Sequence, residues 1–222
     1  MRKLLILAVL MCGAVYAFAG PTEFTFLGWN GGDWQNGYPY YIQPSDNPAS
    51  VIAVMCDDYV HGGEPGDQWE ANITDLGSDN IMMTRFNTIS GPNALYALLL
   101  YDEAGWILLQ TPQTPSTQWL DMNEAVWTIF DSSATCGSDC RAWIASAQEA
   151  ARMGFPGTDF NKVYIVTPTD QHDSDPHSIQ EFLYIGEDPS GSGANNQTTP
   201  EPGTFVLMGS GLLVALRRKV WS

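Results

Sequence analysis

The chain has 222 residues, of which 25 are acidic and nine are basic, giving a formal net charge of −16 at pH 7. Hydrophobic residues make up 44% and aromatic residues 12%, a composition typical of a folded protein and not of a disordered one. Nucleic-acid binding requires many Lys and Arg side chains to neutralise phosphates, so this charge balance excludes a nucleic-acid-binding role. The length suffices for one domain with a substantial core.

The N-terminus has the pattern of a secretory signal peptide. Two basic residues come first, residues 4–15 are apolar, and Ala17-Phe18-Ala19 is a small-x-small cleavage site. We therefore expect residues 1–19 to be removed during export, with Gly20 as the first residue of the mature chain.

Residues 20–75 have the pattern of β-strands. Residues 22–29 are rich in β-forming side chains, and residues 38–42 follow a loop rich in Gly and Asn. Residues 51–55 form a continuous apolar run, which is typical of a buried central strand. Residues 68–75 alternate apolar and polar side chains, as a strand with one buried face does.

Three segments in the middle of the chain have helical patterns of apolar residues. They are residues 93–110, residues 118–130, and a segment that starts at a cap on Ser138 or Asp139 and ends at Met153. Gly105 is the weak point of the first of these helices, because Gly disfavours a helix interior.

Strands return at residues 163–166 and 182–185. The order is β-strands, an insert of three helices, and closing strands, so we expect a mixed α+β fold in one acidic domain, residues 20–188. Residues 189–199 are rich in Gly, Ser and Asn and have the composition of a flexible linker.

The last segment, residues 200–222, has a pattern of its own. It consists of Pro200-Glu201-Pro202, an apolar run at residues 205–216, and a basic cluster of Arg217, Arg218 and Lys219. The apolar run is shorter than the roughly 20 residues that a membrane-spanning helix needs. These parts and their order resemble the PEP-CTERM sorting tail of Gram-negative bacteria.

That resemblance implies processing by an exosortase. It implies that the tail holds the protein transiently in the inner membrane until the enzyme cuts near the motif, and that the product then reaches the cell surface or the extracellular matrix. A tail anchor oriented by its positive charges is the alternative. Removing both terminal signals leaves four basic residues against 25 acidic ones, so the mature formal charge is −21.

The cysteines predict one local disulfide. An exported protein meets an oxidising compartment, and three cysteines remain once Cys12 is removed with the signal peptide. Cys136 and Cys140 are spaced for a small disulfide at a loop-to-helix junction. Cys56 would then be a buried thiol, pair with one of the other two, or have a reactive role.

Two segments resemble the thioester domains of bacterial surface adhesins. In that family a cysteine follows a buried strand, and a later helix carries a Gln-x-Ala-Ile/Val-Trp motif. Here Met55-Cys56-Asp57-Asp58-Tyr59 resembles the first element, and Asn123-Glu124-Ala125-Val126-Trp127 resembles the second. The resemblance implies Cys56 and Asn123 as a thioester-like pair.

Asn123 departs from the glutamine of that family. A thioester forms when the thiol attacks a side-chain amide carbonyl and releases ammonia, a mass loss of ~17 Da. Asn is one methylene shorter than Gln, so the same backbone geometry leaves its carbonyl short of the Cys56 sulfur.

Other constellations give weaker signals. Residues 171–177 hold two His and two Asp, and Asp57-Asp58, Glu64 and Asp67 form a second acidic group, but neither has the spacing of a zinc site or an EF-hand loop. The sequence contains no Gly-x-Ser-x-Gly element, phosphate-binding Gly loop or dinucleotide fingerprint. We therefore assign no catalytic residue, metal or cofactor.

The sequence thus favours an exported, non-enzymatic surface or matrix protein with an adhesin-like binding or structural role. Its expected partners are the processing exosortase and an exopolysaccharide or other surface ligand. Two alternatives stay open, namely a secreted hydrolase acting on polysaccharide and a covalent adhesin of the thioester type that uses Cys56.

Overall fold

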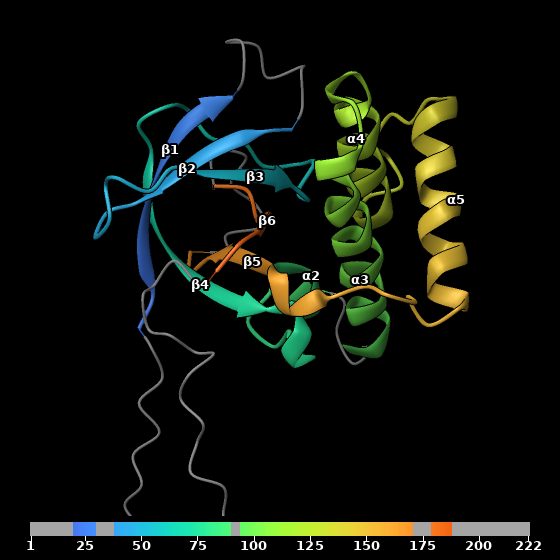
Figure 1. Cartoon of the computed structure of the whole chain (residues 1–222). Coiled ribbons are helices and arrows are strands. Elements are labelled where there is room, and N and C mark those ends of the chain that lie inside the picture. Colours follow the sequence, from blue (N-terminus) through green and yellow to red (C-terminus); the bar gives the residue numbers. More distant parts are fainter. Residues whose placement is uncertain (1–19, 30–37, 90–93, 171–178, 188–222) are drawn as a thin grey trace, which may run out of the picture. The chain divides into compact units, whose positions relative to one another are not determined.

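The computed structural model describes residues 20–29, 38–89, 94–170 and 179–187, all within one compact unit, Met1–Glu187 (Figure 1). The expected signal peptide, linker and sorting tail lie outside the described residues. The described part has a mixed α+β fold, which confirms the fold class expected from the sequence.

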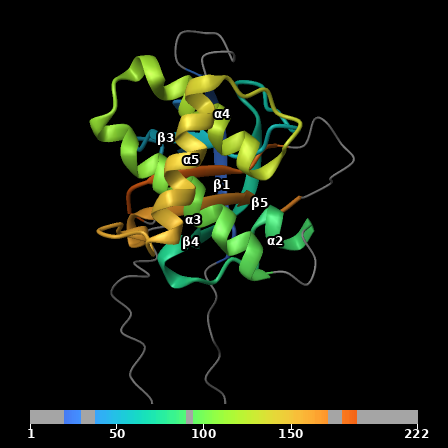
Figure 2. The ribbon, with the colours of Figure 1, turned by 90° about the vertical axis from the view of Figure 1, so that its right-hand side faces the viewer.

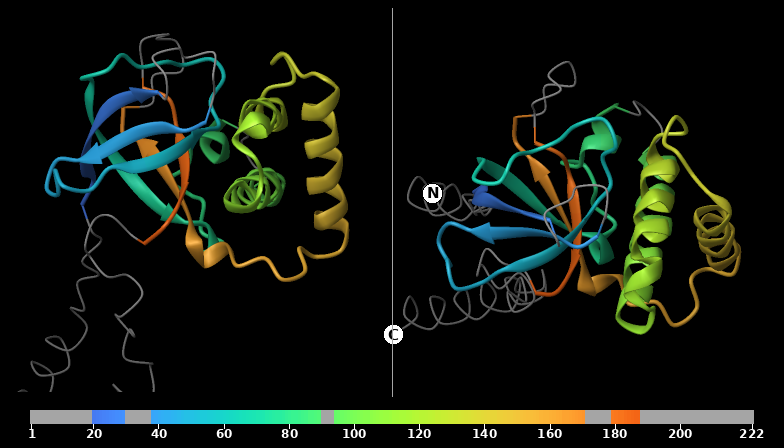
Figure 3. Two further views of the ribbon diagram at one scale, coloured as in Figure 1. Left: turned by 45° about the horizontal axis from the view of Figure 1, so that its top comes forward. Right: turned by 90° about the horizontal axis from the view of Figure 1, so that it is seen from above.

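Six antiparallel strands close into a barrel in the order β1-β2-β3-β6-β5-β4 (Figures 1 and 3). They are β1 Thr22–Trp29, β2 Tyr40–Pro44, β3 Ile52–Cys56, β4 Gln68–Asp75, β5 Val163–Pro168 and β6 Phe182–Ile185. Every strand lies where the sequence predicts one, within two residues at either end. Closure depends on pairings between distant segments, above all β3 with β6.

The helices lie between β4 and β5 in the chain and pack beside the barrel (Figures 1 and 2). They are α2 Arg85–Ile89, α3 Ala94–Gln110, α4 Trp119–Phe130 and α5 Ser138–Arg152. The three longer helices correspond to the three expected from the sequence. The sequence did not predict α2, which has only five residues and is too short to show a periodic pattern.

The start of α5 differs from the expectation. Gly137 is the N-cap residue in an extended conformation, and no side chain caps the helix. The prediction of a cap at Ser138 or Asp139 is therefore wrong, because both residues already lie inside the first turn. A disulfide between Cys136 and Cys140, expected from their spacing, closes that turn.

Two hydrophobic clusters meet at the wall of the barrel. The barrel interior is rich in aromatic side chains, among them Phe24, Phe26, Tyr40, Trp69 and Phe182. The second cluster joins α3, α4 and α5 to the outward-facing residues of β3, β5 and β6. Successive residues of β3 belong to different clusters, since Met55 packs with the helices and Cys56 lies in the barrel cluster.

Gly105 marks a close contact between α3 and the rest of the domain. A Cβ atom at this position would lie 2.7 Å from Leu76 Cδ2 and 3.4 Å from Val163 Cγ1. Ala favours a helix over Gly by about 1 kcal/mol, but overpacking a core costs about 1–3 kcal/mol. We expect Gly105→Ala to lower the free energy of unfolding in a urea titration. A stabilised variant would contradict the packing argument. Gly62→Ala is the control, because Gly62 lies outside the helices and strands and a Cβ there meets no atom within 4 Å.

Candidate functional site

The end of β3 and the residues before β6 lie side by side. Cys56 pairs with Phe182 in antiparallel register, and the Asp57 N–H donates to the Glu181 carbonyl oxygen at 3.4 Å. Side chains alternate between the two faces of a strand. Cys56 and Gln180 therefore share the barrel side, whereas Asp57 and Glu181 face the helices.

The sulfur of Cys56 contacts a side-chain amide. Cys56 Sγ lies 3.0 Å from Gln180 Oε1 and 3.1 Å from the backbone carbonyl oxygen of Asp58. The Asp58 N–H donates to the same sulfur at 3.4 Å. Cys56 is fully buried and Gln180 is 7% exposed. A thiol and a carboxamide are thus held against each other at the edge of the barrel interior.

Asn123 lies beside Cys56 but contacts its main chain. The residue is fully buried on α4, and its Nδ2 donates to the Cys56 carbonyl oxygen at 3.1 Å. The predicted neighbourhood of Cys56 and Asn123 is therefore present, and the amide that touches the sulfur is that of Gln180. Sequence reasoning did not single out Gln180. The polar pair Gln180-Glu181 between Ile179 and the apolar strand β6 was the available signal.

The surroundings of Cys56 keep its thiol protonated. Burial raises the pKa of the Cys56 thiol well above its usual value, and the carboxylates of Asp58 and Asp57 raise it further. The hydrogen bond from the Asp58 backbone opposes this rise. A reaction at this sulfur must therefore include a proton transfer.

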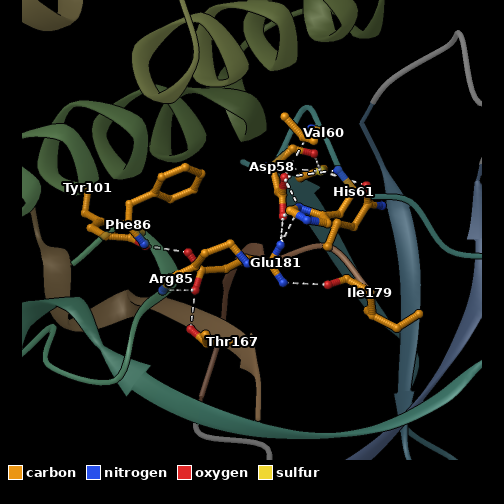
Figure 4. Close-up of polar contacts among 11 residues, drawn as sticks. Asp58, Val60, His61, Arg85, Phe86, Tyr101, Thr167, Ile179 and Glu181 are labelled. Carbon is orange, nitrogen blue, oxygen red and sulfur yellow. Dashed lines mark hydrogen bonds and ion pairs between the residues drawn. The ribbon is translucent and has the colours of Figure 1, made fainter. Parts of the chain in front are cut away.

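A buried ion-pair network lies next to the sulfur (Figure 4). Arg85, the first residue of α2, is 1% exposed, and its Nη1 forms an ion pair with Asp58 Oδ2. Its Nη2 donates to the Ile179 carbonyl oxygen at 2.8 Å. His61 Nδ1 lies 2.8 Å from Asp58 Oδ2. Arg85 therefore ties the segment after Cys56 to the segment before Gln180.

Glu181 accepts hydrogen bonds from several elements. The Arg85 N–H donates to its Oε2 at 2.9 Å, and the hydroxyls of Tyr101 and Thr167 donate to its two carboxylate oxygens. Burial raises the pKa of Glu181, while these hydrogen bonds lower it. Across the strand pair, burial and the Glu181 charge raise the pKa of Asp57 well above its usual value. We therefore place the negative charge on Glu181 and a proton on Asp57.

The raised pKa of Asp57 predicts how stability depends on pH. The stabilising contribution of a group whose folded pKa is raised is complete below the unfolded pKa, here about 3.9. It is lost as the pH rises through the higher folded pKa. Asp57→Asn cannot ionise, so we expect it to be more stable than the wild type at alkaline pH. Urea titrations across the pH range test this, with Asp46→Asn at an exposed carboxyl as the control. An identical pH dependence in Asp57→Asn and the wild type would contradict the protonation assignment.

Gln180 lines a pocket of about 310 Å³ at the edge of the barrel. Much of its wall is aromatic, formed by Trp29, Tyr40, Tyr59 and Trp127. The ring centroids of Tyr59 and Trp127 are 5.6 Å apart. Asp58 and His61 line the same pocket. The pocket gives a small molecule or a protruding side chain access to the Gln180 amide.

The acidic groups noted in the sequence do not form a metal site among the described residues, where no cluster of three or more His, Cys, Asp or Glu side chains could hold a metal ion. Asp57 and Asp58 are buried in the network above, and the Glu64 N–H donates to Asp67 Oδ2 within a turn. Residues 171–178, with their His and Asp side chains, lie outside the described residues.

The three cysteines of the mature chain have separate roles. Cys136 and Cys140 form the expected disulfide, whereas Cys56 is a free, buried thiol. Cys56 therefore stays available for chemistry with Gln180.

Comparisons with known proteins find one sequence motif and similar solved structures. Residues 198–219 match the family model of the PEP-CTERM protein-sorting motif. The N-terminal domain of the Streptococcus pyogenes pilus tip adhesin Cpa is similar in structure, with a TM-score of 0.46 and 11% identity over 78% of this chain and 97% of that one. The N-terminal thioester domain of a surface protein from Clostridium perfringens, a cysteine-to-alanine mutant, is also similar in structure. Its TM-score is 0.42 and its sequence is 12% identical, over 75% of this chain and 99% of that one. A search of curated proteins finds no match.

The matched motif contains the residues that carry the sorting-tail resemblance. Pro200-Glu201-Pro202 and the basic cluster Arg217, Arg218 and Lys219 all fall within residues 198–219. Among the described residues, no helix is both long and apolar enough to cross a membrane. The chain carries a PEP-CTERM protein-sorting motif, which identifies it as an exported protein directed to the cell surface and processed by an exosortase.

Proposed function

We propose that this exported protein is an adhesin that attaches to its target covalently, through an internal thioester between Cys56 and Gln180. One observation carries the proposal, namely the 3.0 Å contact between Cys56 Sγ and Gln180 Oε1 in a buried site. This contact places the sulfur beside the amide whose carbon, Cδ, it would attack, and holding two reacting groups together gives a large rate advantage. The resemblance of residues 55–59 to the cysteine segment of thioester domains supports the same chemistry.

The bond would form without a cofactor. The Cys56 sulfur attacks the Gln180 Cδ, a C–S bond forms, and the bond from Cδ to Nε2 breaks. The thiol proton leaves with the amide nitrogen as ammonia, so the protein loses ~17 Da. All atoms of the step come from these two side chains.

Burial would protect the thioester until a target arrives. Water hydrolyses thioesters, and Cys56 is fully buried while Gln180 is only 7% exposed. The pocket leads to the acyl group at Gln180. A nucleophile that enters it would attack the Gln180 acyl carbon, form a new bond there and release Cys56 as a thiol. Because each molecule reacts once, we assign an adhesin role and no enzymatic turnover.

The sorting motif indicates where the acceptor would be found. Once the exosortase has processed the tail, the domain reaches the cell surface or the extracellular matrix. The acceptor is then a nucleophilic group on another surface or in an exopolysaccharide matrix.

A labelled nucleophile tests the proposal on the exported protein. We expect a biotin-labelled alkyl amine to stay attached to the wild type through denaturation, and Cys56→Ala to remain unlabelled. An unlabelled wild type, or equal labelling of Cys56→Ala, would refute covalent attachment through Cys56.

The aromatic wall of the pocket favours a second candidate, non-covalent binding of a saccharide. Aromatic rings stack well on apolar ring faces, and four of them line this pocket. A glycan array combined with a reducing-sugar assay separates this candidate from a secreted polysaccharide hydrolase. Binding without release of reducing ends supports a binding protein, whereas release of reducing ends supports the hydrolase.

A further inference from the structure

We infer that His61, held by Asp58, is the proton-transfer group of this site. It would take the proton from the nucleophile that attacks the Gln180 acyl group and return a proton to the Cys56 sulfur. The inference rests on the proposed thioester and adds a third residue to the reaction.

The first argument is the contact between His61 and Asp58. His61 Nδ1 lies 2.9 Å from Asp58 Oδ1 and 2.8 Å from Asp58 Oδ2. The Arg85 guanidinium, which can only donate, lies against the same nitrogen. We infer the tautomer that donates from Nδ1 to Asp58, because Nδ1 is within hydrogen-bond distance of both Asp58 oxygens and Arg85 Nη1 has Asp58 as its own acceptor. The neutral ring then has its lone pair on Nε2. A carboxylate that orients an imidazole in this way is the arrangement of a general base.

The second argument is the state of Nε2. This atom is buried and has no hydrogen-bond partner within the part of the chain that the structure describes. The His61 side chain is only 7% exposed. Buried polar atoms without a partner are rare in proteins and call for an explanation. A reacting group in the pocket that His61 lines together with Gln180 would supply the missing partner.

The third argument is the local backbone. Asp58 Oδ1 also accepts the N–H groups of Val60 and His61, each at 3.2 Å. The same residue contacts the Cys56 sulfur through its backbone N–H and carbonyl oxygen. One short turn thus holds the nucleophile, the carboxylate and the imidazole (Figure 4).

The charged and titratable groups around His61 come from several elements. Asp58 contacts the ring from its own turn, and the Arg85 guanidinium of α2 lies against Nδ1. Tyr40 of β2 and Gln180, which precedes β6, share the pocket with the ring. Burial raises the pKa of Tyr40 far above its usual range, so Tyr40 does not titrate near neutral pH.

The attack on the Gln180 acyl carbon requires a group that accepts one proton and donates another. When a nucleophile X–H attacks Cδ of Gln180, the C–X bond forms, the C–S bond breaks, and X–H must lose a proton. Burial and the neighbouring Asp58 carboxylate raise the pKa of the Cys56 thiol, so the sulfur leaves most easily when it gains a proton. His61 would accept the first proton at Nε2 and deliver it to the sulfur.

Methylamine is the probe for this inference. The full exported protein is treated with methylamine between about pH 5 and pH 8, the range in which an unperturbed imidazole titrates. Formation of the methylamide is followed by mass. Each rate is divided by the fraction of molecules with the ~17 Da loss and by the concentration of unprotonated methylamine.

The main variant is His61→Asn, whose amide can still donate to Asp58 but cannot act as a base. We expect the variant to react about 10²–10⁴-fold more slowly than the wild type. The control Lys162→Gln changes an exposed residue that does not line the pocket, and we expect the wild-type rate.

Three outcomes would overturn the inference. The first is His61→Asn reacting at the wild-type rate with the wild-type pH profile. The second applies if that variant fails to fold: His61→Gln, whose amide is not a base either, then reacts at the wild-type rate. A wild type without the ~17 Da loss would refute the proposed thioester itself, and the mass spectrum distinguishes this failure from the other two.

Discussion

Gln180→Glu is expected to abolish both the ammonia loss and the covalent capture of amines. The variant keeps the length of the side chain, but thiol attack would have to expel hydroxide or oxide from a carboxylate that resists nucleophiles. The wild type is expected to lose ammonia, because Cys56 Sγ lies 3.0 Å from the Gln180 amide oxygen. Intact mass and labelling with a biotin-labelled alkyl amine measure both effects on the same sample.

Asn123→Ala is the matched control for this prediction. Asn123 donates to the Cys56 carbonyl oxygen at 3.1 Å, so its removal leaves a buried acceptor without that donor and costs about 1–3 kcal/mol. If Gln180 is the acyl donor, the folded fraction of Asn123→Ala still shows the ~17 Da loss. Loss of the thioester in Asn123→Ala together with its retention in Gln180→Glu would assign the acyl group to Asn123.

Arg85→Met is expected to destabilise the protein by about 3–5 kcal/mol, because it leaves the buried carboxylate of Asp58 without its guanidinium partner. Arg85 and Asp58 are only 1% and 3% exposed. The variant also loses the bond from Nη2 to the Ile179 carbonyl oxygen. Since a domain is typically stable by about 5–15 kcal/mol, such a loss is large. Urea denaturation at neutral pH measures it.

Arg152→Met is the control for the ion pair. Arg152 pairs with Glu149 on the surface of α5, where the two side chains are 73% and 47% exposed. Exposed ion pairs contribute about 0–1 kcal/mol, so we expect little change. If the two substitutions lower the free energy of unfolding equally, burial does not determine how much the Arg85 ion pair contributes to stability.

The strands and the long helices could be predicted from the sequence because their signals are local. The apolar run at 51–55 and the alternation at 68–75 each fix a strand within a few residues, and both strands are present as β3 and β4. The helix α2 could not be predicted, because five residues do not complete two helical turns. Closure of the barrel could not be predicted either, since pairing of β3 with β6 joins segments more than 100 residues apart.

The site illustrates the same limit. The sequence indicated Cys56 through its position after a buried strand, but its amide partner is 124 residues away. The polar pair Gln180-Glu181 before strand β6 was a local signal, but it did not indicate that Gln180 contacts Cys56. Asp57 and Asp58 belonged to an acidic group without a specific spacing in the sequence. Both are buried in the structure, and Arg85 of a distant element pairs with Asp58.

Peptide mapping of the exported wild-type protein tests the thioester most directly. Trypsin cuts after Arg85 and Lys162, which places Cys56 and Gln180 on different peptides. Digestion at mildly acidic pH preserves thioesters well enough for mass spectrometry. We predict a cross-linked pair of these two peptides with a mass ~17 Da below their sum. Two separate peptides, with an intact Cys56 thiol and an intact Gln180 amide, would contradict the proposed function.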